Sequence, residues 1–303
     1  MSAAALPVRK NHLDALAIAL LMLCCLFWGG QQVLIKATLT ELPPVFQAWL
    51  RLGGATLLLM LWCRARGIAL FTRDGTLGAG LLAGALFAGE FICIYLGLQH
   101  TGASRLTVFL YTSPFWVALL VPLKIRTERL HRAQWLGLAL AFGAVVYALR
   151  EGLLHGQATL RGDLLGLAAG MFWGLTTVVI RGSTLTQIPA EKLLFYQVGV
   201  SAVALPLLSL AIGEVWVWPP SAFAWASVLT QASVGGFLSF LVWMWLLGRY
   251  PATRMSTFVF FTPLFSLLFG ALWLGETVTS GVLLAIAAVA AGMVLMNRKP
   301  ARA

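Results

Sequence analysis

The chain has 303 residues, of which 60% are hydrophobic and only 10% are charged, and its mean hydropathy is +0.89. Soluble domains carry about 25% charged residues, so this composition excludes a soluble protein and indicates one embedded in a membrane. None of the five lysines follows a glycine as a phosphate-binding loop requires, which argues against direct ATP hydrolysis.

Ten continuous apolar stretches divide the chain, each long enough to cross about 30 Å of hydrocarbon as a helix. They lack the alternation of a membrane β-barrel. The sequence therefore predicts an all-α integral membrane protein with ten transmembrane helices. The predicted spans are Ala15–Ile35, Pro43–Cys63, Gly75–Leu98, Leu106–Leu123, Ala133–Leu149, Leu164–Ile180, Leu193–Gly213, Phe223–Gly248, Met255–Gly275 and Thr277–Asn297.

The net charge of +11 is distributed unevenly between the two sides of these spans. With a cytoplasmic N-terminus, sixteen basic residues lie inside and only Lys36, Arg105, Arg150 and Arg161 lie outside. The positive-inside rule then predicts that residues 1–13 and 298–303 are cytoplasmic tails. The basic charge faces anionic lipid, so no nucleic-acid partner is expected.

The sequence also repeats. Phe27-Trp28-Gly29 recurs 145 residues later as Phe172-Trp173-Gly174, and Pro114 recurs 149 residues later as Pro263. Each copy holds five spans, so the second copy enters the membrane in the opposite sense, and the inverted repeats cover residues 14–150 and 161–297. Inverted repeats of this kind place a substrate site near the bilayer midplane and operate by alternating access.

These residues carry a resemblance to a known family. The paired Phe-Trp-Gly triplets, Ala48–Arg51, His100–Arg105 and Leu274–Glu276 resemble the drug/metabolite transporter superfamily in its EamA branch, over about Asp14 to Asn297. Within that branch the chain looks like bacterial inner-membrane exporters of amino acids, including the aromatic amino-acid exporters. The resemblance implies a secondary transporter.

Trp28 and Trp173 are repeat mates near the middle of their spans, away from the interface where tryptophan usually lies. Either they pack between helices, or they line a central cavity and stack on the substrate. Gln31, Gln32 and Thr177 follow them by about one helical turn and share their faces.

Pro114 and Pro263 fall near the centres of the fourth and ninth spans, where a proline kinks a helix. Either these kinks only adapt the packing of the helices, or they form gates. Tyr111 and Phe260 lie one turn before these prolines and are expected to face the cavity.

The sixth span contains Gly162, Gly166, Gly170 and Gly174 at four-residue spacing. Such a stripe of small residues predicts the close approach of another backbone.

Arg51 and Glu90 are the only charged residues within the predicted spans, and they lie at equal depth. Equal depth favours an ion pair between them. Contact with substrate and proton coupling by Glu90 are the alternatives, since charge inside a membrane is usually functional.

Together these observations predict a secondary transporter of a bacterial inner membrane that exports small metabolites, with aromatic or bulky apolar amino acids favoured. A multidrug or other metabolite carrier, a passive pore and a membrane-embedded enzyme are the alternatives. No enzyme activity, cofactor or metal is expected; lipid and a small molecule are the expected partners, and a monomer is compatible with the sequence. The expected substrate-binding residues are Trp28, Gln31, Gln32, Phe87, Glu90, Phe91, Tyr95, Tyr111, Trp173, Thr177, Gln231, Phe237 and Phe260, with Pro114 and Pro263 as gating residues.

Overall fold

The computed structural model describes residues 14–124, 157–218, 220–250 and 261–297, with isolated positions 135, 136, 140, 143, 147 and 259. Every regular element in these ranges is a helix. The helices are α1 (Ala15–Thr38), α2 (Pro44–Arg66), α3 (Leu77–Leu98), α4 (Ala103–Leu110), α5 (Ser113–Lys124), α7 (Gln157–Arg181), η1 (Thr184–Gln187), α8 (Ala190–Ala211), α9 (Ala222–Thr230), η2 (Gln231–Leu238), α10 (Ser239–Arg249), α12 (Phe261–Leu274) and α13 (Ser280–Asn297).

Six of these helices are long and apolar enough to cross a membrane, which confirms an all-helical, multi-pass membrane protein. A seventh apolar helix, Phe261–Leu274, is shorter. Most of the predicted span Ala133–Leu149 lies outside the described residues. The six are Ala15–Thr38, Pro44–Arg66, Leu77–Leu98, Thr159–Arg181, Ala190–Ala211 and Ala222–Trp243.

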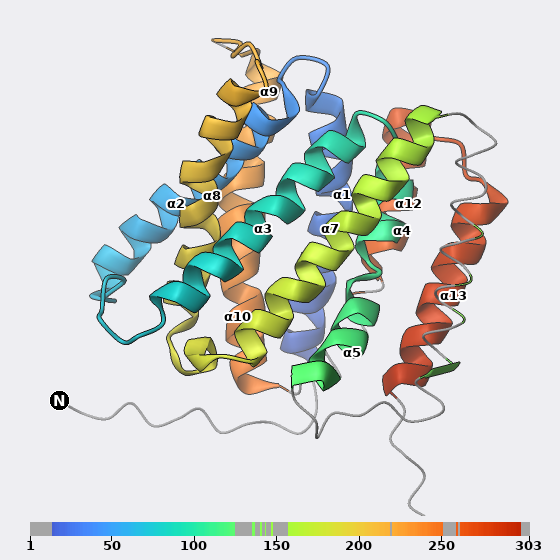
Figure 1. Ribbon diagram of the computed structural model, residues 1–303. Helices are drawn as coiled ribbons and strands as arrows, with labels where there is room; N and C mark the ends of the chain where they lie inside the picture. The colour runs from blue at the N-terminus through green and yellow to red at the C-terminus, as the bar shows by residue number, and fades with distance from the viewer. Residues whose placement is uncertain are drawn as a thin grey trace, which may run out of the picture.

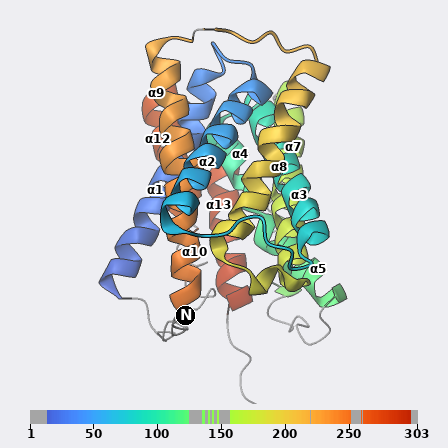
Figure 2. The same ribbon diagram turned by 90° about the vertical axis from the view of Figure 1, so that its left-hand side faces the viewer.

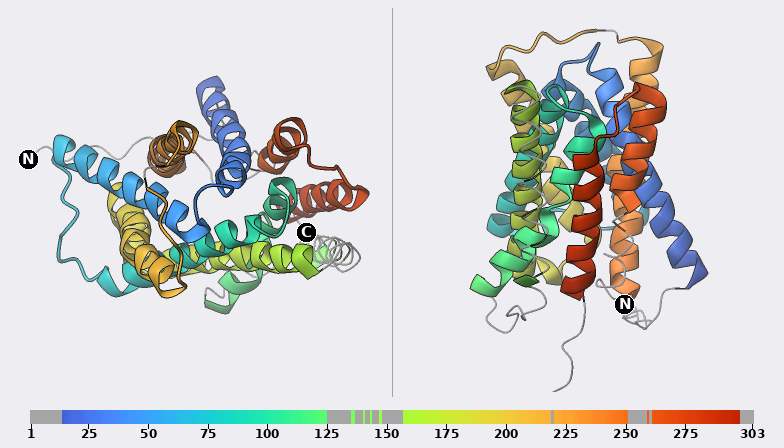
Figure 3. Two further views of the ribbon diagram at one scale, coloured as in Figure 1. Left: turned by 90° about the horizontal axis from the view of Figure 1, so that it is seen from above. Right: turned by 90° about the vertical axis from the view of Figure 1, so that its right-hand side faces the viewer.

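The helices form an upright bundle in which α3 and α7 pack side by side (Figure 1). Seen along the bundle, α1 lies between the α9–α10 helix and α12 (Figure 3), and α2 packs against α8 (Figure 2). Helix α1 begins and α13 ends at the same end of the bundle, here named the base. The opposite end, where α1 ends and α4 begins, is named the top.

The predicted fourth span is two helices rather than one kinked helix. Helix α4 ends at Leu110, the chain turns at Tyr111 and Thr112, and α5 begins at Ser113. Pro114 therefore lies in the first turn of α5, where the backbone N–H that proline lacks would have no partner within the helix. Pro263 similarly lies in the first turn of α12. The predicted kink at the centre of the fourth span is thus wrong, because the chain breaks just before Pro114; residues 251–258 and Phe260, which precede α12, lie outside the described residues.

The predicted eighth span is continuous but changes its winding. Between α9 and α10, η2 is a π-helix, which closes hydrogen bonds over five residues instead of four. A Cβ atom at Gly235 would lie 2.0 Å from Gln31 Oε1, and one at Gly236 would lie 2.7 Å from the Ala55 Cβ. Glycine thus lets η2 contact both α1 and α2 closely.

The predicted close approach at the glycine stripe of α7 is confirmed. A Cβ atom at Gly170 would lie 2.9 Å from the carbonyl oxygens of Phe109 and Leu110 on α4. Gly174 meets the start of α5 in the same way, with Ser113 O at 3.2 Å. The stripe therefore positions both halves of the broken helix against α7.

Candidate functional site

Trp28 lies in a cluster of aromatic rings between α1 and α10. Its indole nitrogen donates a hydrogen bond to Ser239 Oγ at 2.9 Å. Its ring centroid lies 5.6 Å from that of Trp243 and 6.3 Å from that of Phe240. Ser239 and Phe240 were not predicted as site residues from the sequence.

Phe240 connects this cluster to α3. Its ring centroid lies 6.0 Å from that of Phe87, which in turn lies 4.7 Å from that of Phe91. The structure therefore brings the predicted residues Trp28, Phe87 and Phe91 together through one ring that the sequence did not identify.

A second aromatic contact joins Tyr111 and Trp173 at 5.4 Å, with the rings nearly perpendicular. The Thr177 hydroxyl donates to the Trp173 carbonyl oxygen on its own helix at 3.1 Å. Phe260, the repeat mate of Tyr111, lies outside the described residues. The half-buried Phe237 packs against the hydrophobic core, and its ring contacts Trp62, an exposed side chain on α2.

Tyr95 and Gln231, predicted from different spans, bind each other. The Tyr95 hydroxyl donates to Gln231 Oε1 at 2.7 Å, and Gln231 Nε2 donates to Ser227 Oγ at 2.9 Å. The Ser227 hydroxyl also shares a hydrogen bond with the Thr38 hydroxyl at 2.7 Å. These buried groups satisfy one another, so this chain of hydrogen bonds holds α1, α3, α9 and η2 together.

Seven of the described residues have a buried side-chain atom without a hydrogen-bond partner. Three of them are Gln47, Trp116 and Thr262, and the other four are Gln31, Gln32, Arg51 and Glu90. We name Gln31, Gln32, Arg51 and Glu90 the unpaired cluster; their exposed fractions lie between 2% and 7%. Its unpartnered atoms are Gln31 Oε1, Gln32 Oε1, Arg51 Nε, Arg51 Nη1 and Glu90 Oε2. A buried polar atom without a partner costs about 1–3 kcal/mol, so a folded protein keeps such atoms for a reason.

The expected ion pair between Arg51 and Glu90 is wrong. Within the part of the chain that the structure describes, no ion pair of 4.0 Å or less joins them. The Arg51 guanidinium instead lies over the Phe91 ring, 4.7 Å from its centroid. Equal depth fixes the height of two residues but not the direction of their side chains, although Arg51 remains close enough to act electrostatically on Glu90.

A contrasting cluster lies at the top of the bundle. Arg105 donates two hydrogen bonds to Asp163, from Nε and from Nη2, both at 2.8 Å. Asp163 also accepts from the Thr101 hydroxyl at 3.4 Å. This two-point pairing of an arginine with a carboxylate joins α4 to α7.

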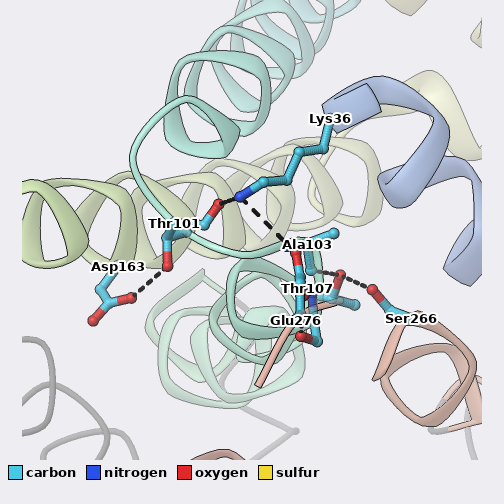
Figure 4. A network of polar contacts seen from close by, with 8 residues as sticks. Lys36, Thr101, Ala103, Thr107, Asp163, Ser266 and Glu276 are labelled. Carbon is cyan, nitrogen blue, oxygen red and sulfur yellow. Dashed lines mark hydrogen bonds and ion pairs between the residues drawn. The ribbon is translucent and has the colours of Figure 1, made fainter. Parts of the chain in front are cut away.

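Glu276 and Lys36 complete the cluster at the top (Figure 4). Glu276 accepts the Ala103 and Ser104 backbone N–H groups at 2.6 and 3.2 Å, and so caps α4. Lys36 donates to the Thr101 carbonyl oxygen and lies 3.9 Å from Glu276 Oε1. We name Lys36, Thr101, Arg105, Asp163 and Glu276 the paired cluster. From the sequence, Lys36 and Arg105 counted only as loop charges, and their acidic partners were not identified.

A further ion pair lies at the base. The Lys192 ammonium donates to Asp74 Oδ2 at 2.6 Å and to the Thr72 hydroxyl at 2.7 Å. This contact lowers the pKa of Asp74 from its ordinary value. It fixes the connection between α2 and α3 against the start of α8. Among the described residues, no group of three His, Cys, Asp or Glu side chains could hold a metal ion.

Known proteins are similar to this chain over nearly its whole length. It is 26% identical over 281 residues to the uncharacterized transporter YoaV of Bacillus subtilis, covering 90% of this chain and 93% of that protein. It is 24% identical over 285 residues to a probable amino-acid metabolite efflux pump of Salmonella typhimurium, covering 90% and 92%. It is 23% identical over 274 residues to the uncharacterized inner membrane transporter YedA of Escherichia coli, covering 90% and 87%.

The fold is also found among solved structures. A crystal structure covers 91% of this chain and 96% of its own with a TM-score of 0.65 at 17% identity, which shows a shared fold. The pattern of the EamA-like transporter family matches this chain twice, over residues 15–150 and 160–298. The chain therefore belongs to the EamA-like transporter family.

Proposed function

We propose that this protein is a secondary transporter that exports small metabolites, preferentially aromatic or bulky apolar amino acids. The unpaired cluster carries this proposal. It places an arginine, a glutamate and two amide oxygens without partners inside an apolar bundle. Such groups are energetically costly there, and ionisable groups inside a membrane usually have a function. A substrate that supplies partners to these groups would offset that cost.

The aromatic rings support the substrate class. Trp28, Phe240, Phe87 and Phe91 form one connected group of rings, and Phe91 lies directly against Arg51. Aromatic rings attract other rings through edge and offset contacts worth about 0.5–1.5 kcal/mol beyond burial. The Salmonella typhimurium relative, named as a probable amino-acid metabolite efflux pump, fits this proposal.

The proposed architecture is ten transmembrane helices in two inverted repeats, residues 14–150 and 161–297. Helices α1 and α7, which begin the two halves, run in opposite directions (Figure 1). Equivalent contacts recur in both halves: a Cβ at Gly29 would lie 2.9 Å from Thr262 O, as one at Gly174 would lie 3.2 Å from Ser113 O. Thr262 follows Ser113 by 149 residues, the repeat distance found in the sequence.

Alternating access then follows from movement of one repeat against the other. The break before Pro114 divides the helix that meets Gly174, and we assign this break and the start of α12 at Pro263 as hinges of the gates. Hinges of this kind absorb a change of backbone angle at a few positions that end an element.

The proposed location is a bacterial inner membrane, with both termini and the base in the cytoplasm. Exposed basic residues at the base, such as Arg64 and Arg66 at the end of α2, fit the positive-inside rule. The Escherichia coli relative is named as an inner membrane transporter. The proposed partners are the substrate and lipid, with no cofactor, nucleic acid or enzymatic reaction; a monomer suffices.

Counterflow in proteoliposomes tests the function. Vesicles loaded with unlabelled amino acids or drugs should accumulate labelled phenylalanine transiently only if they hold an exchanged substrate. We expect exchange with aromatic and bulky apolar amino acids. Exchange seen only when a labelled drug replaces labelled phenylalanine would assign a multidrug carrier, and flux of phenylalanine without exchange would assign a pore; either result would contradict the proposal.

Two tryptophan variants test the aromatic contacts. Trp28→Ala and Trp173→Ala should each reduce counterflow of phenylalanine by about fivefold to tenfold, because ring contacts are lost. Trp62→Ala is the matched control, since Trp62 is exposed on the outer face of α2. Equal counterflow in all three variants, at equal amounts of folded protein, would leave the two central tryptophans as packing residues.

A further inference from the structure

We infer that Arg51 and Glu90 bind the two charges of a zwitterionic substrate, Arg51 its carboxylate and Glu90 its ammonium group. The inference rests on the proposed transport of amino acids and assigns the head-group contacts of that site. It replaces the ion pair expected between these two residues, which the structure does not contain.

Arg51 is a permanently charged group without an anionic contact. Its side chain is almost completely buried, and Nε and Nη1 have no hydrogen-bond acceptor. The Phe91 ring covers the guanidinium face but accepts none of the hydrogen bonds along its edge. An arginine retains its charge even when buried, so these N–H groups require an oxygen acceptor, and a carboxylate suits a guanidinium best.

Glu90 presents the complementary group. Its side chain is buried, and Oε2 has no hydrogen-bond partner. Glu90 directly precedes Phe91, whose ring centroid lies 4.7 Å from the Arg51 guanidinium carbon, and no ion pair joins Glu90 to Arg51 within the described residues. A direct ion pair would have to break before it could bind a ligand, whereas a guanidinium and a carboxyl group that are not paired with each other are already available to a molecule that carries both signs.

Among the described residues that have a buried atom without a partner, Arg51 and Glu90 are the two with ionisable side chains; the others are Gln31, Gln32, Gln47, Trp116 and Thr262. Arg105 gives Nε and Nη2 to Asp163, and Tyr95 and Gln231 bind each other. An additional carboxylate at Arg105 would compete with a partner already in place. The unpartnered atoms therefore assign the head group to Arg51 and Glu90.

The aromatic rings around this pair match the rest of the molecule. Phe91 follows Glu90 directly in α3 and contacts both Arg51 and Phe87, from which the rings continue to Phe240. A zwitterion held between Arg51 and Glu90 would place an aromatic side chain among these rings. A simple anion or a simple amine would satisfy only one of the two charges.

Three ligands that share one ring distinguish these possibilities: phenylalanine, 2-phenylethylamine, which lacks the carboxylate, and 3-phenylpropionate, which lacks the ammonium group. Their dissociation constants are measured with the purified full-length protein in detergent. The wild type should bind phenylalanine at least tenfold more tightly than either analogue, since each loses a charge-assisted contact. Binding either analogue as tightly as phenylalanine would overturn the inference without any variant.

Charge-removing variants locate each contact. In Arg51→Gln the preference for phenylalanine over 2-phenylethylamine should fall about tenfold, while its preference over 3-phenylpropionate remains. In Glu90→Gln the preference for phenylalanine over 3-phenylpropionate should fall about tenfold, while its preference over 2-phenylethylamine remains. A residue that only supports the fold would weaken all three ligands together, and that outcome would contradict the assignment.

Controls separate this inference from the proposed function. Arg64→Gln removes the same charge from an exposed position of α2 and should leave both ratios unchanged. Arg51→Lys retains the charge and should retain most of the preference over 2-phenylethylamine. If the wild type exchanges aromatic amino acids but Arg51→Gln keeps both ratios, the inference fails and the transporter stands. If the wild type neither binds nor exchanges any amino acid, the proposed function fails.

Discussion

The paired and unpaired clusters contain the same kinds of charged group in opposite states. In the paired cluster, Arg105 and Asp163 share two hydrogen bonds of 2.8 Å, and Glu276 caps a helix. In the unpaired cluster, Arg51 and Glu90 are also buried but do not touch each other. The paired cluster therefore holds the helices together at the top, and we propose that the unpaired cluster is available to a ligand.

This comparison predicts opposite effects of mutation. Loss of one member of a satisfied buried pair leaves its partner uncompensated, which destabilises the fold. Replacement of an unsatisfied polar group by an apolar one of similar size removes a cost that the fold already carries. Stability and transport should therefore respond differently at the two clusters.

The largest expected effect is at the paired cluster. Arg105→Leu leaves the Asp163 carboxylate without its two-point partner and should reduce the free energy of unfolding by about 3–5 kcal/mol. The double variant Arg105→Leu/Asp163→Leu should recover most of this loss. Thermal unfolding in detergent measures both; a single variant as stable as the wild type would show that the pair contributes nothing.

A smaller loss is expected where helices meet through glycine. In Gly29→Ala the new Cβ would lie 2.8 Å from the Ser266 backbone nitrogen on α12, so the helices must move apart at a cost of about 1–3 kcal/mol. Gly53→Ala is the control, because its Cβ would meet only Trp49 Nε1 at 3.5 Å. Equal melting temperatures of the two variants would refute the predicted clash.

The unpaired cluster should respond in the opposite direction. Gln32→Leu removes a buried carbonyl oxygen without a partner and should leave stability unchanged or raise it by about 1 kcal/mol. Counterflow of phenylalanine should fall at the same time. A loss of stability as large as that of Arg105→Leu would show that Gln32 supports the fold and not the ligand.

The smallest effect concerns pH at the base, where Lys192 lowers the pKa of Asp74. A carboxyl group with a lowered pKa in the folded protein stabilises it above the ordinary value of 3.8, and this contribution disappears as the pH falls towards the folded value. Asp74→Asn should therefore flatten the loss of stability below about pH 4. Identical acid profiles for variant and wild type would contradict the contribution of this pair.

The length of the apolar stretches was sufficient to predict the helices that are neither broken nor rewound. The first, second, third, sixth, seventh and tenth spans agree with α1, α2, α3, α7, α8 and α13 to within a few residues, except that α7 begins about two turns earlier, at Gln157. The fourth and eighth spans differ from the prediction because of features of the backbone. The chain breaks at Tyr111 and Thr112, and η2 winds as a π-helix; neither changes the hydropathy from which the spans were predicted.

The sequence indicated which side chains would lie within the bundle, but not in which direction they would point. Trp28, Phe87, Phe91, Tyr95 and Gln231 lie in contacts within the bundle, as their positions in the spans indicated. Rotation about a helix axis is not encoded in depth, so the Arg51–Glu90 pair was wrongly expected. The partners of Arg105 and Glu276 depend on packing between segments more than fifty residues apart, for which one sequence offers no periodic signal.

Ligand-dependent stability tests most directly the claim that the unpaired cluster binds substrate and the paired cluster does not. Phenylalanine at one hundred times its dissociation constant should stabilise the wild type by about 2.7 kcal/mol. The double variant Arg105→Leu/Asp163→Leu should show the same increase, whereas Arg51→Gln, with an affinity about tenfold weaker, should show only about half of it, about 1.4 kcal/mol, at that concentration. An undiminished increase in Arg51→Gln, or its loss in the double variant alone, would contradict the account.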